Sequence, residues 1–226
     1  IERKFLFLAN ISNGIVSCLN LNEAGEITGL ASKIAVTPLK KAFKPHAIVS
    51  SVDGRFLFVP DIGGGRIVKL SLDRQSGKLK FVESIVSKDF VGPRHFTFDQ
   101  EGKTGYLVNQ MGEAVTVFRY DAKDGKLTQI GHEQSLPDDK LTINNHIAEI
   151  KIHPSGKYVY VSNRGHNSVT LYNRDQKTGE LSFVECVSSE GLAPWSFALG
   201  PQGRYLFCSN SKSNNLAVFK IDFLTF

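Results

Sequence analysis

The sequence predicts an all-β fold, a β-propeller built from four-stranded antiparallel blades. The first observation is a seven-residue pattern that begins with Lys or Arg, is apolar in the middle and ends in Asn or Asp. It occurs five times, at 4–10, 55–61, 103–109, 157–163 and 204–210. Successive copies are about 50 residues apart, which is close to the length of one propeller blade.

The second observation is that strand-like runs surround each copy. Four copies follow an apolar run that is closed by a glycine: Gly54, Gly102, Gly156 and Gly203. Glycine there supplies the positive φ that a tight hairpin needs. A third run leads to Asn22, Asp73, Asp121, Asp175 or Asp222, which we interpret as turn residues, and in four repeats a fourth run follows. We therefore expect one propeller domain over 1–226, with partial or complete blades at 1–36, 46–87, 94–136, 146–188 and 195–226.

Composition and charge exclude several classes of protein. The chain has 226 residues, 41% hydrophobic content and a net charge of +5 that is scattered along the sequence. We expect no nucleic-acid partner, because no Lys/Arg stripe occurs, and no membrane segment, because no apolar run approaches about 18 residues. Three widely spaced cysteines, Cys18, Cys186 and Cys208, suggest neither a disulfide framework nor a zinc site and favour the reducing cytoplasm. No metal or cofactor is expected, and the oligomeric state is left open.

Polar residues gather where the fold would bring strand ends together. The first strand of a propeller blade lines the central channel, so its start and the end of the second strand meet at one channel mouth. Aligning the repeats places nine candidate residues there: His46, Asp61, Arg94, His95, Gln110, Glu149, Arg164, His166 and Trp195. Asp61 is also expected to form hydrogen bonds with the backbone of the turn that follows it. Trp195 is expected either to plug the central channel or to form one wall of a ligand site. His153 is expected on the surface, at the end of the blade opposite the channel mouth.

Most of these residues differ between repeats, so the repeat itself does not require them. One interpretation is a structural ion-pair network. The other is a site for an anionic small molecule, because two guanidinium groups suit bidentate binding of a carboxylate or a phosphate.

The segments HAIVSSVDGRFLFVPDIG, GPRHFTFDQEGKTGYLVNQ, AEIKIHPSGKYVYVSNRGHNSV and PQGRYLFCSNSKSNNLAVF resemble the seven-bladed propeller lactonases. That family includes bacterial 6-phosphogluconolactonases and the fungal carboxymuconate-lactonizing enzyme. The resemblance covers nearly the whole chain and implies a seven-bladed parent, from which this chain lacks about two N-terminal blades and a closing strand. It also implies a lactone site at the channel mouth, with functional positions at His46, Arg94 and Arg164.

The chain departs from the family pattern at two positions. The family usually has Asn-Glu where this chain has Asn109-Gln110, and that glutamate is a proposed catalytic residue. It usually has Pro-Arg where this chain has Pro194-Trp195. A glutamine cannot act as a general base, and the loss of an arginine weakens anion binding.

Three functions follow as hypotheses. The first is a 6-phosphogluconolactonase-like hydrolase that opens a phosphorylated or carboxylated sugar-acid lactone by water attack. In it Arg94 and Arg164 hold the substrate or the oxyanion, His46 or Glu149 is the base, and Gln110 orients the water. The substrate contacts would be His95, His166, Trp195 and Asp61. The second is carboxy-cis,cis-muconate cyclase (lactonizing) activity, and the third is a non-catalytic binding scaffold, which Gln110 and Trp195 favour.

Overall fold

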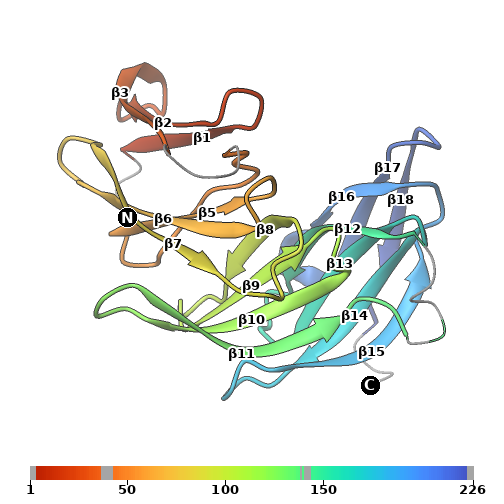
Figure 1. The fold of residues 1–226 in the computed structure, drawn as a ribbon. Helices are drawn as coiled ribbons and strands as arrows, with labels where there is room; N and C mark the ends of the chain where they lie inside the picture. Colours follow the sequence, from red (N-terminus) through yellow and green to blue (C-terminus); the bar gives the residue numbers. More distant parts are fainter. Residues whose placement is uncertain (1–3, 37–42, 138, 140–143, 223–226) are drawn as a thin grey trace.

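The computed structural model describes residues 4–36, 43–137, 139 and 144–222, and these residues form five antiparallel sheets (Figure 1). The sheets follow one another in chain order around an arc, from the red first sheet to the blue last one. The all-β propeller-like fold is thus confirmed. The predicted outer limits of the domain, 1–3 and 223–226, lie outside the described residues.

The strands of the five sheets run in sequence order. The first sheet contains β1 (Phe5–Asn10), β2 (Ile15–Leu21) and β3 (Ile27–Ala35). The second contains β4 (Val49–Ser50), β5 (Phe56–Asp61), β6 (Arg66–Leu72) and β7 (Leu79–Val86). The third contains β8 (Pro93–Phe98), β9 (Thr104–Asn109), β10 (Ala114–Asp121) and β11 (Lys126–Gln134).

The fourth and fifth sheets complete the described fold. The fourth contains β12 (His146–Ile152), β13 (Tyr158–Arg164), β14 (Ser168–Arg174) and β15 (Leu181–Ser188). The fifth contains β16 (Pro194–Leu199), β17 (Tyr205–Asn210) and β18 (Asn215–Lys220), with the 3₁₀ turn η2 (Pro201–Gly203) between its first two strands. The apolar part of every seven-residue repeat falls in one strand: β1, β5, β9, β13 or β17.

The core lies between neighbouring sheets. The described residues form four apolar clusters, and each cluster combines residues from two consecutive sheets. Adjacent residues of one strand serve different clusters: Leu57 packs toward the first sheet and Phe58 toward the third. This follows from the alternation of side chains along a strand, and it explains why the middle strands are apolar on both faces.

The first and last sheets each expose large apolar side chains. Four of them are Leu6 and Leu8 of β1 and Leu216 and Val218 of β18, and all four are exposed. The sequence-based expectation of further blades stays a prediction.

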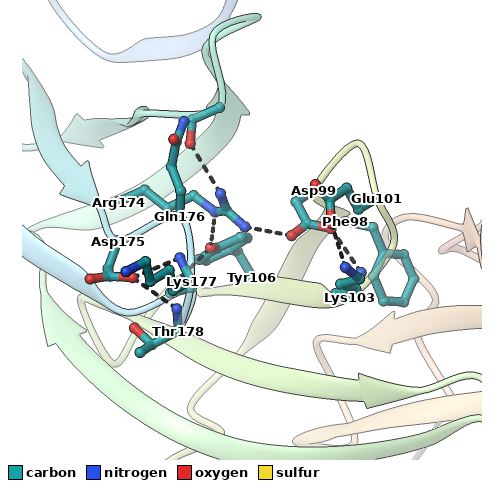
Figure 2. Close-up of polar contacts among 12 residues, drawn as sticks. Phe98, Asp99, Glu101, Lys103, Tyr106, Arg174, Asp175, Gln176, Lys177 and Thr178 are labelled. Carbon is teal, nitrogen blue, oxygen red and sulfur yellow. Dashed lines mark hydrogen bonds and ion pairs between the residues drawn. The ribbon is translucent and has the colours of Figure 1, made fainter.

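A polar network joins the third and fourth sheets at the end opposite the predicted channel mouth (Figure 2). The Arg174 guanidinium lies 2.5 Å from the Asp99 carboxylate and donates a hydrogen bond of 2.6 Å to the Tyr106 hydroxyl. Tyr106 in turn donates to the carbonyl of Gly179. Both side chains of the ion pair are only 7% exposed, so this contact is a buried link between blades.

Turn residues behave largely as predicted. The carboxylates of Asp73, Asp121 and Asp175 each accept a hydrogen bond from the backbone NH two residues later. His153 is a correction, because it is 3% exposed rather than at the surface. Its Nε2 lies 3.2 Å from the carbonyl oxygen of Gly203, in the hairpin of the next sheet.

Candidate functional site

Backbone pairing brings the predicted strand ends together in four sheets. The residue pairs are Pro45 with Asp61, Pro93 with Asn109, His146 with Arg164, and Pro194 with Asn210. The first strands β8, β12 and β16 also contact one another in order around the arc. Side chains at the starts of these strands therefore converge at one end of the molecule.

Two arginines and a tryptophan form the centre of this cluster. The Arg164 guanidinium carbon lies 4.1 Å from the Trp195 ring centroid, and that of Arg94 lies 5.7 Å from the same ring. Arg94 donates a hydrogen bond of 2.5 Å to the carbonyl oxygen of Ala148, and Arg164 donates one of 3.3 Å to that of His146. Trp195 is half-exposed, so an aromatic surface lies beside two cations and remains open to a ligand.

Three buried polar atoms of this cluster have no hydrogen-bond partner among the described residues: Nε of Arg94, Nη2 of Arg164 and Nδ1 of His46. Within the described part of the chain, neither arginine forms an ion pair with a carboxylate. Buried polar groups are normally satisfied, so these unpaired atoms are open to a hydrogen bond from water or from a bound molecule.

The electrostatics of the cluster favour an anion. Burial lowers the pKa of Arg94 to about 10, and the like charge of Arg164 acts in the same direction, while Glu149 opposes it. Burial also lowers the pKa of Arg164. Because both remain protonated at neutral pH, the site holds two cations that a carboxylate or phosphate would stabilise.

His46 is held neutral beside these cations. Burial, followed by the charge of Arg94, lowers its pKa to about 4. Its ring centroid lies 5.2 Å from that of His95.

Glu149 is the acidic residue of the cluster. Oε1 accepts hydrogen bonds from Nδ1 of His95 at 2.9 Å and from the Ile150 NH at 3.1 Å, and it lies 3.3 Å from Nζ of Lys151. Oε2 accepts one from the Ser196 hydroxyl at 3.0 Å. Burial alone raises the pKa of Glu149, but the hydrogen bond and charge of His95, the charge of Lys151 and the Ile150 NH lower it to about 2.

Six of the nine predicted site residues are linked by these contacts: His46, Arg94, His95, Glu149, Arg164 and Trp195. Gln110 lies next to the start of β8, where its backbone NH donates to the carbonyl of Gly92. The role of Gln110 in orienting water stays a prediction.

His166 and Asp61 have contacts of a different kind. Nδ1 of His166 lies 2.8 Å from the Ser168 hydroxyl and 3.8 Å from Sγ of Cys186, so it faces the outer strands of its own sheet. Asp61 is fully buried, pairs with Arg66 at 2.6 Å and accepts the Gly64 NH. These are the contacts of turn residues, and a substrate role for either stays a prediction.

Two residues that contact Glu149, Ser196 and Lys151, are not among the candidates that the sequence predicts. Ser196 occupies the same repeat position as His95 and Glu149, one sheet further on, and this alignment was the available signal. Lys151 lies two residues beyond Glu149 on β12, so it shares a face of that strand. Among the described residues, no group of three or more His, Cys, Asp or Glu is arranged to hold a metal ion.

Comparison with known proteins identifies the family. A family model described as "Lactonase, 7-bladed beta-propeller" matches residues 1–225. The chain belongs to this lactonase family. It is 29% identical over 98% of its length to a 6-phosphogluconolactonase of Bacillus subtilis and 30% identical over 97% to one of Formosa agariphila.

A solved structure of a gluconolactonase has a similar fold. The periplasmic gluconolactonase PpgL of Pseudomonas aeruginosa superposes with a TM-score of 0.85 and 29% identity, over 97% of this chain and 63% of that one. The chain spans 64% of the length of the two curated relatives named above. Within the described residues, no helix is long and apolar enough to cross a membrane.

Proposed function

We propose that the protein hydrolyses a sugar-acid lactone that carries an anionic group, as a 6-phosphogluconolactonase does. The observation that carries the proposal is the set of buried, unpaired nitrogen atoms on Arg94, Arg164 and His46. The names of the relatives support the reaction, and the two guanidinium groups support the anionic substrate.

In this proposal the two arginines have electrostatic roles. Nε of Arg94 and Nη2 of Arg164 donate hydrogen bonds to the anionic group of the substrate or to the oxyanion that forms at the lactone carbonyl. Removing a single such donor from a hydrolase commonly costs about 10²- to 10³-fold in kcat. Trp195 provides the adjacent wall, against which the face of a sugar ring packs.

The test is lactone hydrolysis, measured as acid release above the spontaneous rate, with 6-phosphoglucono-δ-lactone as substrate. We expect turnover by the wild-type protein and loss of most of it, per folded molecule, in Arg94→Ala, although removal of this buried side chain lowers the thermal midpoint. Arg119→Ala is the matched control, because Arg119 lies exposed on β10. Unfolding of Arg94→Ala would instead assign Arg94 to a structural network.

The same assay separates the alternatives. Conversion of carboxy-cis,cis-muconate without lactone hydrolysis would support the lactonizing reaction. No turnover of either substrate, with Gln110→Glu equally inactive, would support a binding scaffold.

We also propose that the protein resides in the cytoplasm. Cys18 and Cys208 are buried free thiols, and burial raises the pKa of each to about 11, which keeps them protonated and unreactive. The Pseudomonas relative is described as periplasmic, so fractionation of the source cells is the measurement that tests this assignment.

A further inference from the structure

His95 has an imidazole ring oriented by a carboxylate. Its Nδ1 lies 2.9 Å from Oε1 of Glu149, across the boundary between the third and fourth sheets. Glu149 is itself fixed by the Ser196 hydroxyl and the Ile150 NH, and its side chain is only 8% exposed. A carboxylate held by several donors is a rigid partner that fixes the direction of the imidazole ring.

The hydrogen bond also fixes the tautomer of His95. An ionised carboxylate can only accept hydrogen bonds, so Nδ1 of His95 must be the donor. In the neutral ring the lone pair then lies on Nε2, the nitrogen on the other side of the ring. This arrangement of carboxylate, imidazole and free nitrogen is the one that general bases use in acyl-transfer enzymes.

The side chain of His95 is more exposed than that of Glu149, the carboxylate that orients it. The His95 side chain is 25% exposed, which leaves room for water. Both oxygens of Glu149, in contrast, already accept hydrogen bonds, and its pKa of about 2 makes it a weak base. His46 is also a weak base, with a pKa of about 4.

The His95–Glu149 pair lies against the anion cluster. The His46 ring, which contains one of the unpaired buried nitrogens, is 5.2 Å from the His95 ring. Besides burial, the charges of Arg94, His95 and Arg164 all lower the pKa of His46, so the His46 ring lies near both arginines and near His95. A lactone held by the two arginines would therefore lie beside His95.

We propose that His95 is the general base of this site and that Glu149 is its positioning residue. This inference rests on the proposed lactone hydrolysis. It assigns to His95 the proton transfer that Gln110 cannot perform.

The proposed step is an acyl transfer from the lactone ring oxygen to water. Nε2 of His95 removes a proton from water while the water oxygen forms a bond to the lactone carbonyl carbon. The carbonyl electron pair moves to the oxyanion and then returns as the bond to the ring oxygen breaks. The ring oxygen leaves as an alcohol that takes the proton from Nε2, so the products are the open hydroxy acid and neutral His95.

The test compares kcat and KM for 6-phosphoglucono-δ-lactone hydrolysis in the wild type and in His95→Gln. A general base contributes about 10²- to 10⁴-fold, so we expect kcat to fall by that factor while KM stays within about twofold. His132→Gln is the matched control, since this histidine lies on the outer strand β11 and bonds Thr116. A kcat for His95→Gln within about threefold of the wild type would overturn the proposal.

Two further variants separate catalysis from folding. In His95→Ala, added imidazole should raise kcat at least about tenfold. This rescue is the decisive readout if His95→Gln folds poorly. A failure of rescue in a folded His95→Ala protein counts against the base assignment. For Glu149→Gln we expect a kcat at least about tenfold lower with KM unchanged, whereas a purely structural role would change the thermal midpoint and leave kcat per folded molecule unaltered.

The inference and the proposed function fail in different ways. Wild-type turnover that depends on Arg94 but not on His95 would keep the lactonase proposal and remove the base assignment. Absence of wild-type turnover would remove both.

Discussion

The Arg164 guanidinium lies against the face of Trp195, 4.1 Å from the ring centroid, and the Arg94 guanidinium lies 5.7 Å from the same ring. The two positively charged guanidinium groups are thus held near the same indole ring, and the three side chains come from the third, fourth and fifth sheets. A cation over an indole face is stabilised by about 0.5–2 kcal/mol. Trp195 therefore has two roles in this account, as a support for Arg164 and as a wall of the site.

The first prediction concerns this tryptophan. Trp195→Ala should raise KM for the phosphorylated lactone by about 3- to 30-fold, because the loss of up to about 2 kcal/mol frees Arg164 from its position. Trp195→Phe, which keeps an aromatic face, should change KM by less than about threefold. Steady-state kinetics of both variants test this, and equal KM values in all three proteins would contradict it.

The second prediction concerns the buried ion pair between blades in Figure 2. Arg174→Met leaves the Asp99 carboxylate buried without its guanidinium partner, so we expect a loss of about 3–5 kcal/mol in the free energy of unfolding. Lys103→Met is the control, because Lys103 and Glu101 form an ion pair that is mostly exposed, and its midpoint should not change. Urea unfolding measures both, and similar midpoints for the two variants would contradict the prediction.

The third prediction is a loss of stability in mild acid. The pKa of His46 is about 4 in the folded protein, against an ordinary value of 6.5, and burial also lowers the pKa of His153. The unfolded chain therefore binds more protons between pH 6.5 and 4, so stability is full above pH 6.5 and falls as the pH drops through this window. Urea midpoints at pH 7.0, 5.5 and 4.5 should fall more steeply for the wild type than for His46→Gln; parallel slopes would count against a neutral buried His46.

The fourth prediction tests the contact that buries His153. Gly203 has φ of +71°, and a Cβ atom there would lie only 1.8 Å from Nε2 of His153. Gly203→Ala should therefore cost about 3 kcal/mol, from backbone strain together with displacement of the histidine. Gly25→Ala has a similar φ of +82° but open space around it, so it should cost about 1 kcal/mol in the same thermal or urea experiment. Equal losses would mean that His153 moves aside without cost.

Alignment of the repeats predicts that several of the candidate residues lie close together, and the structure places them so. His95, Glu149 and Ser196 occupy one aligned position in three successive repeats, and in the structure each is hydrogen-bonded to the next. Alignment of a repeated sheet therefore predicts neighbours on adjacent sheets, even though the residues are about 50 positions apart.

Other features depend on geometry that the repeat does not encode. His166 lies after Gly165, whose φ is +122°, and before Asn167, whose φ is +61°, and this irregular turn directs the histidine toward Ser168. His153 is buried because the hairpin of the next sheet contacts it, which depends on how the blades pack. The stacking of Arg164 on Trp195 likewise depends on side-chain conformations that alignment cannot supply.

The measurement that tests the central claim most directly is the ratio of kcat/KM values for 6-phosphoglucono-δ-lactone and unphosphorylated glucono-δ-lactone, each corrected for spontaneous hydrolysis. Charge-assisted hydrogen bonds contribute about 1.5–3 kcal/mol, so the account predicts that the phosphorylated lactone is preferred by about 10- to 100-fold. The preference should disappear in Arg164→Met. Equal kcat/KM values for the two lactones in the wild-type protein would contradict the assignment of Arg94 and Arg164 to an anion-binding lactonase site.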